Sequence, residues 1–194
     1  VATGLKAKLV TWAQYVELES AKRSMETGKV VDTFQRRLAN KLVISKIKHA
    51  IGLDELFVDV SGAAPTALST LEFFASIGIL LHEDYGMTEA TGMATAQPFG
   101  MPRFGSVGQA LPGVKVRIAD DGEIQLRGPT MVSGYLYMPD ESAALNTDDG
   151  WIRTGDLGAV DKDGFLSITG RKKDLLITAG GENVAPAEME NHLQ

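Results

Sequence analysis

The chain has 194 residues, of which 44% are hydrophobic and 23% charged, a composition typical of a globular domain rather than of a disordered or fibrous protein. A net charge of -6 provides no general attraction for nucleic acid, and the absence of cysteine excludes disulfides, cysteine-ligated zinc and a cysteine nucleophile. No stretch approaches the roughly 20 apolar residues that a membrane-spanning helix needs.

The two ends of the sequence have the character of the interior of a longer chain. No Met stands at position 1, and the last residues, His192-Leu193-Gln194, belong to a pattern that predicts the first turns of a helix. We therefore expect an internal fragment. Because no membrane-spanning run is present, we expect it in the cytoplasm or as a peripheral protein at a membrane surface. A signal peptide would lie outside such a fragment.

Two helices are predicted in the first fifty residues. Apolar residues recur at intervals of three and four from Leu5 to about Thr27, and Gly28 follows as the helix end. A second helical pattern runs from Val31 to Ile51, with several basic side chains on its polar face. A solvated face explains these charges better than a docking site does.

A β-α-β unit is predicted next. Residues 56–60 have the composition of a buried strand, Pro65 suits the first turn of a helix, and a second strand is predicted to begin at Ile79. Ligands of open α/β sheets bind beyond the carboxyl ends of the strands. We therefore expect residues 61–64 and 85–89, which follow the two strands, to face one crevice.

Short alternating runs after Pro102 predict antiparallel hairpins. One has its turn at Asp120-Asp121-Gly122 and another at residues 161–164. The fold class is therefore α/β, a β-α-β unit followed by an antiparallel, partly barrel-like subdomain from about Arg103 to Thr169.

The sequence Tyr85-Gly86-Met87-Thr88-Glu89 combines groups that suit a nucleotide. An aromatic ring can stack on a base, a Thr hydroxyl can bond a phosphate or carboxylate oxygen, and a Glu carboxylate is a hard oxygen ligand of the kind that Mg²⁺ prefers. In isolation, five such residues would form an ordinary loop in most proteins.

Two further motifs follow near the C-terminal end. In Trp151-Ile152-Arg153-Thr154-Gly155-Asp156-Leu157, an ionised Asp156 could accept both hydroxyls of a ribose, or could merely cap a turn. Gly170-Arg171-Lys172-Lys173-Asp174 has the pattern of a basic turn. Beyond it, Gly180-Gly181 permits positive φ and close approach to a ligand, although a plain turn has the same pattern.

In this order and at these separations, the three motifs resemble the nucleotide site of AMP-forming adenylating enzymes. The surrounding sequence resembles long-chain fatty acyl-CoA synthetases, in particular their bubblegum-like branch. The branch assignment depends on residues 45–48, 71–74 and 177–186.

The resemblance implies the site residues. Those expected to contact the nucleotide or co-substrate are Gly62, Ala63, Ala64, Tyr85, Gly86, Thr88, Asp156, Arg171, Gly180 and Gly181. Thr88 is expected to contact the α-phosphate or the reacting carboxylate, and Glu89 to help hold Mg²⁺. Lys173 is expected to be the hinge, so that the catalytic residues are Thr88, Glu89 and Lys173. Gly134-Tyr135-Leu136 matches another family block, in which we expect only a hairpin and a packed tyrosine.

The domains implied are an α/β portion of the AMP-binding domain (1–102), the barrel-like subdomain (103–170), and the hinge with the start of a small C-terminal domain (171–194). The implied reaction uses ATP and Mg²⁺ to convert a fatty acid to acyl-AMP and then transfers the acyl group to coenzyme A. Acyl chain length, organelle and oligomeric state are not indicated, and peripheral membrane association stays open.

Some features depart from the family. The Ser/Thr/Gly-rich phosphate loop is expected before Val1 and a catalytic Lys after Gln194, so the isolated chain is expected to be inactive. Asp84 replaces a small or apolar residue. Two alternatives stay open: a ligase for aryl or amino acids, and a non-catalytic AMP-binding remnant.

Overall fold

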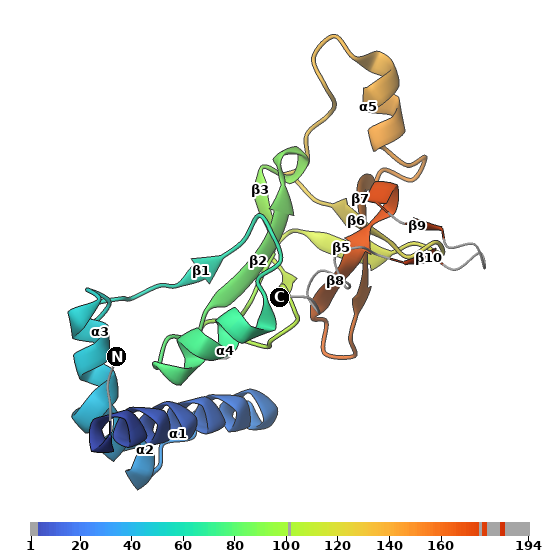
Figure 1. Cartoon of the computed structure of the whole chain (residues 1–194). Helices are drawn as coiled ribbons and strands as arrows, with labels where there is room; N and C mark the ends of the chain where they lie inside the picture. Colours follow the sequence, from blue (N-terminus) through green and yellow to red (C-terminus); the bar gives the residue numbers. More distant parts are fainter. Residues whose placement is uncertain (1–3, 101, 175, 178–182, 185–194) are drawn as a thin grey trace. The chain divides into compact units, whose positions relative to one another are not determined.

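A computed structural model describes residues 4–100, 102–174, 176–177 and 183–184 of the chain (Figure 1). The chain forms two compact units. Unit 1 consists of Val1–His82 and Pro98–Phe104, and unit 2 consists of Glu83–Gln97 and Gly105–Gln194. Compactness therefore groups residues 83–97 with the C-terminal half. The domain boundaries predicted from the family resemblance stay a prediction.

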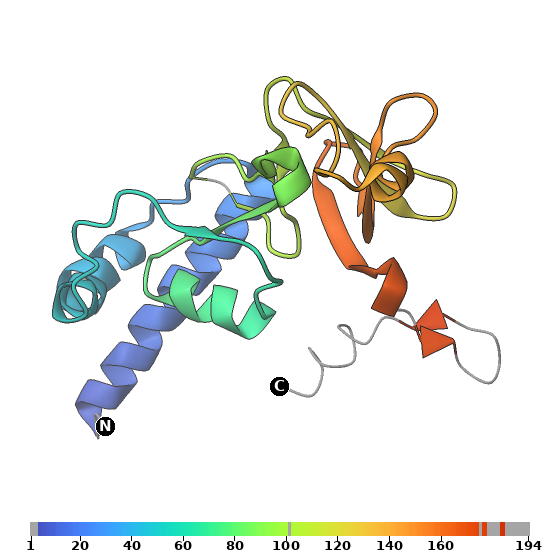
Figure 2. The same cartoon turned by 90° about the horizontal axis from the view of Figure 1, so that it is seen from above.

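Helices dominate unit 1. α1 spans Leu5–Thr27 and ends at Gly28, whose φ of 65° is left-handed. The second predicted helix is also confirmed, but it begins later, at α2 (Phe34–Ala39), and continues through a π-helical turn, η1 (Asn40–Ile44), into α3 (Ser45–Ala50). α1 packs against α2, η1 and α4 (Leu68–Ser76) (Figure 1 and Figure 2). Buried apolar side chains at the α1 contacts are Ala13, Val16, Ala39, Val43 and Ile44.

The predicted β-α-β unit differs from the structure at its first strand. β1 contains only Val60–Ser61, and residues 56–58 remain exposed, with Phe57 at 96%. The prediction of a buried strand at 56–60 is therefore wrong, because apolar composition does not itself supply the neighbouring elements that bury a strand. α4 also begins three residues after Pro65.

A histidine bridge closes unit 1. The Nδ1 of His82 lies 2.8 Å from Asp59 Oδ1, and its Nε2 accepts the Gly100 N–H at 2.9 Å. Because Nε2 is an acceptor, the Nδ1 carries the proton and donates to Asp59. Through His82, the bridge connects Asp59, just before β1, with Gly100. It is therefore one of the contacts that attach residues 98–104 to unit 1.

Unit 2 begins with an antiparallel hairpin. β2 (His82–Met87) is followed by a 3₁₀ turn, η2 (Thr88–Ala90), and by β3 (Gly92–Ala96), which pairs with β4 (Gln109–Ala110). The predicted second strand thus begins at His82 rather than at Ile79. The β2–β3 register shifts between Tyr85 and Gly86, where a Cβ on Gly86 would lie 1.8 Å from the Gly92 carbonyl oxygen. Only glycine fits this bulge.

The second sheet of unit 2 confirms both predicted hairpins. Its antiparallel order is β5-β6-β7-β8, with β5 at Lys115–Ile118, β6 at Glu123–Arg127, β7 at Ile152–Val160 and β8 at Leu166–Arg171. The core includes Ile124, Leu126 and Leu166. The segment between β6 and β7 extends away from the strands and carries α5 (Pro139–Leu145) (Figure 1).

A short region follows the second sheet. After β8 come a 3₁₀ turn, η3 (Lys172–Asp174), and the strand pair β9 (Leu176–Ile177) and β10 (Asn183–Val184).

Candidate functional site

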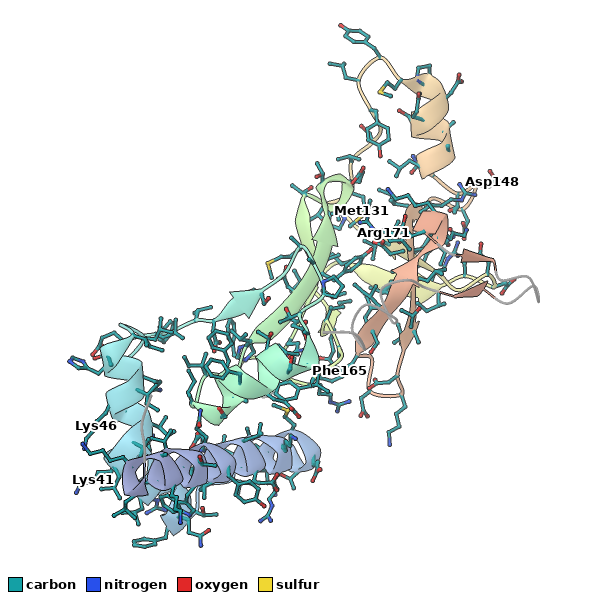
Figure 3. The ribbon with its side chains drawn as sticks, viewed as in Figure 1. Lys41, Lys46, Met131, Asp148, Phe165 and Arg171 are labelled. Atoms are coloured by element: carbon teal, nitrogen blue, oxygen red, sulfur yellow. The ribbon has the colours of Figure 1, made fainter. Side chains whose placement is uncertain are left out.

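Three residues predicted for the site meet around one carboxylate in unit 2. Asp156 is 6% exposed; its Oδ2 accepts the Tyr85 hydroxyl at 2.8 Å, and its Oδ1 accepts the Arg171 Nε–H at 2.9 Å. Asp156 and Arg171 are cross-strand partners in β7 and β8, and Tyr85 comes from β2. Figure 3 labels Arg171, whose side chain lies among those of the neighbouring strands. The fold therefore joins Tyr85 and Asp156, which lie 71 positions apart in sequence, by a hydrogen bond.

The backbone around Asp156 is held by two neighbours. The Asp156 N–H donates to Thr154 Oγ1 at 3.1 Å, and that hydroxyl donates to the Ile124 carbonyl at 2.7 Å. The Gly155 N–H donates to Glu123 Oε1 at 2.9 Å, with Gly155 at a left-handed φ of 73°. The backbone bonds of Gly155 and Asp156 thus help to fix the orientation of Asp156, together with the partners of its carboxylate.

Tyr85 serves as a neutral donor. Burial raises the pKa of the Tyr85 hydroxyl strongly, and the adjacent Asp156 carboxylate raises it further. The residue is 7% exposed and belongs to the apolar core of unit 2, together with Ala90 and Ala94. The structure thus shows a hydrogen-bonded tyrosine in the core, and its contact with adenine stays a prediction.

Lys172 forms a second ionic cluster beside this site. Its Nζ lies 2.6 Å from Asp121 Oδ2 and 3.0 Å from Glu123 Oε2. The hydrogen bond that Lys172 donates to Asp121, followed by the one it donates to Glu123, raises the pKa of Lys172. Glu123 is 4% exposed, so one buried carboxylate bonds both the Gly155 amide and Lys172.

Sequence reasoning missed Glu123, because its segment was expected to be a structural hairpin only. A charged residue directly after the turn glycine, within an alternating apolar strand, was the signal available. The structure shows that this position faces the interior of unit 2, where a carboxylate needs partners.

The predicted loop at Thr88 and Glu89 forms the η2 turn. Thr88 is exposed and Glu89 is half-buried. The Tyr135 hydroxyl donates a hydrogen bond to Glu89 Oε1 at 2.5 Å. This bond is the main reason why the pKa of Tyr135 is raised. Tyr135 is 38% exposed, so the expectation of a packed tyrosine is wrong, whereas the expectation of a structural role stays a prediction.

The remaining predicted site residues are distributed elsewhere. Gly62, Ala63 and Ala64 are exposed in unit 1, with Ala63 at a φ of 67° that is uncommon for a residue with a Cβ. The expectation that these residues and Tyr85 face one crevice stays a prediction, because they belong to different units. Lys173 lies exposed in η3, directly after Arg171 and Lys172. Gly180 and Gly181 lie outside the described residues.

Two absences hold for the parts of the chain that the structure describes. The described residues contain no group of three or more histidine, cysteine or acidic residues that could hold a metal ion. None of their helices is long and apolar enough to cross a membrane.

Comparisons with known proteins agree with the sequence motifs. Residues 11–136 match the family described as AMP-binding enzyme. ACSBG2 of Xenopus laevis, a long-chain-fatty-acid–CoA ligase, is 40% identical over 192 residues, which cover 96% of this chain and 26% of the relative. FadD15 of Mycobacterium bovis, also a long-chain-fatty-acid–CoA ligase, is 43% identical over 155 residues, which cover 80% of this chain and 26% of the relative.

A solved structure supports the same assignment of fold. O-succinylbenzoate coenzyme A synthetase (MenE) of Bacillus subtilis, in complex with ATP and magnesium ion, is 28% identical with a TM-score of 0.63. The match covers 86% of this chain and 41% of that chain. The present chain spans about a quarter of the length of the two curated relatives.

Proposed function

Because this chain belongs to the AMP-binding enzyme family, we propose that it is the nucleotide-binding part of an ATP-dependent ligase that joins a long-chain fatty acid to coenzyme A. The observation that carries this proposal is the buried Asp156 carboxylate with its partners Tyr85 and Arg171. The similarity to two long-chain-fatty-acid–CoA ligases supports the choice of substrate.

Asp156 would bind the ribose of ATP. An ionised carboxylate offers about four acceptor positions on its two oxygens. Tyr85 and Arg171 use one position on each oxygen, which leaves one on each for the two ribose hydroxyls. The partners also fix the carboxylate before the nucleotide arrives, which reduces the entropy lost on binding.

Arg171 would complete the contact from the other side. Its Nε–H is bonded to Asp156, and its side chain is 60% exposed. Among the described residues, its terminal amino groups make no hydrogen bond, so they are free to reach ribose or phosphate oxygens. A guanidinium presents several donors in one plane, which suits such acceptors.

Mg²⁺ would be held by Glu89, and the residues present fit this ion. Mg²⁺ bound to a nucleotide usually takes one or two carboxylates and completes its shell with phosphate oxygens and water, so a cluster of acidic residues is not required. Glu89 is half-buried at the η2 turn, beside the exposed Thr88 hydroxyl. When bound, the ion neutralises charge on the phosphates.

We assign Thr88 to the α-phosphate or the reacting carboxylate, and Lys173 to the hinge between adenylation and thioester formation. Lys173 follows two residues that are ion-paired to buried carboxylates, Asp156 and Glu123, and is itself exposed, as expected where chain movement would begin. The predicted small-residue loop (62–64) and Gly180-Gly181 would contact adenine and the coenzyme A thiol, respectively. Because the expected phosphate loop and C-terminal Lys are not within the sequence, we propose that this chain alone does not complete the reaction.

The test is AMP release by the complete protein that carries this chain, supplied with ATP, Mg²⁺ and a series of acids. The proposal predicts release that requires both coenzyme A and a fatty acid, and that varies with acyl chain length. Activity with aryl or amino acids alone would identify a different ligase. Binding of AMP without turnover of any acid would identify a non-catalytic nucleotide-binding protein.

A further inference from the structure

Tyr135 approaches the carboxylate proposed to hold Mg²⁺ from a distant part of unit 2. Its hydroxyl donates to Glu89 Oε1 at 2.5 Å across 46 residues of sequence. Among the described residues, no hydrogen bond reaches the other oxygen, Oε2. One oxygen of Glu89 is therefore fixed by a donor, and the other is available to a cation.

Two more hydrogen bonds attach the same segment to the η2 turn. The Val132 N–H donates to the Glu89 carbonyl at 2.8 Å, and the Thr91 hydroxyl donates to the Thr130 carbonyl. Met131, labelled in Figure 3, packs against the core of unit 2 between these two contacts. Residues 130–135 thus hold both the main chain and the side chain of Glu89.

The backbone of Tyr135 is fixed from its other side by α5. Its N–H donates to Ser142 Oγ at 2.7 Å, and the Ser142 hydroxyl lies 2.6 Å from the Met138 carbonyl, which accepts its proton. A Cβ on Gly134 would lie 2.7 Å from the same Ser142 Oγ, so only glycine allows this approach. The tyrosine is therefore positioned by α5 and does not depend on Glu89 for its backbone conformation.

We propose that Tyr135 is a positioning residue for the metal ligand Glu89. The proposal rests on the function proposed above, in which Glu89 binds Mg²⁺. A carboxylate that binds a metal through one oxygen is oriented by the hydrogen bond that its other oxygen accepts, and loss of such a supporting bond typically weakens metal affinity by about 10- to 100-fold. The hydroxyl of Tyr135 supplies this bond, and α5 transmits its position from the segment between β6 and β7.

The test compares Tyr135→Phe with Tyr137→Phe. The first removes only the hydroxyl that reaches Glu89; the second removes the same group two residues away, where the side chain is 92% exposed. The complete protein is titrated with Mn²⁺ as a spectroscopic probe in the presence of a non-hydrolysable ATP analogue, and metal binding is followed by electron paramagnetic resonance. Nucleotide affinity in EDTA is measured in parallel.

The expected result is Mn²⁺ binding weakened about 10-fold or more in Tyr135→Phe, unchanged in Tyr137→Phe, and equal nucleotide affinity in EDTA for all three proteins. A merely structural role would lower nucleotide affinity in EDTA as well. Equal Mn²⁺ affinity of Tyr135→Phe and the unaltered protein would overturn the proposal.

Glu89→Gln separates this proposal from the proposed function. If Glu89→Gln binds Mn²⁺ as tightly as the unaltered protein, Glu89 is not the ligand and the role of Tyr135 is refuted, while nucleotide binding stands. If the unaltered protein binds no nucleotide with or without metal, the proposed function itself fails. We expect the fold to persist in Tyr135→Phe, because Tyr135 is already 38% exposed. Thermal unfolding of each variant verifies this.

Discussion

The antiparallel sheet of unit 2 and the apolar run of unit 1 contrast in one respect. Both have clear strand patterns, yet β5, β6, β7 and β8 form with a buried core, whereas Phe57 in the apolar run is 96% exposed. Hairpin partners lie close in sequence, so the pairing of β5 with β6 and of β7 with β8 is local, and the paired strands pack on Tyr85, Ala90 and Ala94 of the same core. A strand of a β-α-β unit depends on neighbours that are distant in sequence, so its pattern alone does not determine its burial.

Gly86→Ala should have the largest effect on the local pairing. A Cβ there would lie 1.8 Å from the Gly92 carbonyl oxygen, so the β2–β3 hairpin must open to accept it. We expect the free energy of unfolding to fall by about 4 kcal/mol or more. The control is Gly150→Ala, which has open space but a φ of 79° and should cost only about 1–2 kcal/mol. Denaturant unfolding followed by circular dichroism measures both, and similar losses would contradict the bulge argument.

Ile124→Ala and Phe57→Ala test the comparison itself. Ile124 is fully buried in β6, so its truncation should cost about 2–5 kcal/mol in the free energy of unfolding. Phe57 should change it by less than about 0.5 kcal/mol, because its side chain is already exposed. A large loss for Phe57→Ala would show that the apolar run is buried in solution, and would restore the predicted strand.

Lys172→Met and Asp121→Asn test separately how much the buried Glu123 carboxylate and the exposed Asp121 carboxylate contribute to stability through their contacts with Lys172. Without Lys172, the Glu123 side chain remains buried with the Gly155 amide as its one partner among the described residues, and we expect a loss of about 3 kcal/mol. Asp121→Asn removes an exposed partner of the same lysine and should lower the free energy of unfolding far less than Lys172→Met does. Equal losses in chemical denaturation would mean that Glu123 does not depend on Lys172.

The smallest effect concerns acid stability. Arg117 and, secondarily, Thr147 lower the pKa of Asp149 to about 2. Because the folded-state pKa lies below the unfolded value of about 3.9, the stabilisation is present above pH 4 and is lost as the pH falls toward 2. Asp149→Asn should therefore flatten the fall in melting temperature between about pH 4 and pH 2. Asp148→Asn is the control, since no ion pair reaches that residue among the described ones; identical profiles for the unaltered protein and Asp149→Asn would refute the shift.

Sequence reasoning succeeded where interactions are local or carried by a motif. The end of α1 at Gly28 and the turn at residues 120–122 follow from residue types alone. The motifs also selected Tyr85, Asp156 and Arg171, which the structure brings together.

The rest could not be predicted because it depends on contacts across strands and loops. Glu123 and Tyr135 lie in segments with ordinary hairpin patterns, and nothing in those patterns shows that their side chains reach Lys172 and Glu89. The burial of residues 56–60 likewise depends on distant neighbours. The roles of Glu123 and Tyr135 are recognised only once the fold places their partners.

The most direct test of the central claim is the affinity of Asp156→Asn for AMP, compared with that of Asp149→Asn. The first variant keeps the shape of the side chain but replaces charge-assisted acceptors for two ribose hydroxyls by a neutral amide, a loss of about 2 kcal/mol or roughly 30-fold in Kd. The second neutralises an exposed carboxylate that is paired with Arg117. The account predicts weakened AMP binding for Asp156→Asn and unchanged binding for Asp149→Asn; equal affinity of Asp156→Asn and the unaltered protein would contradict it.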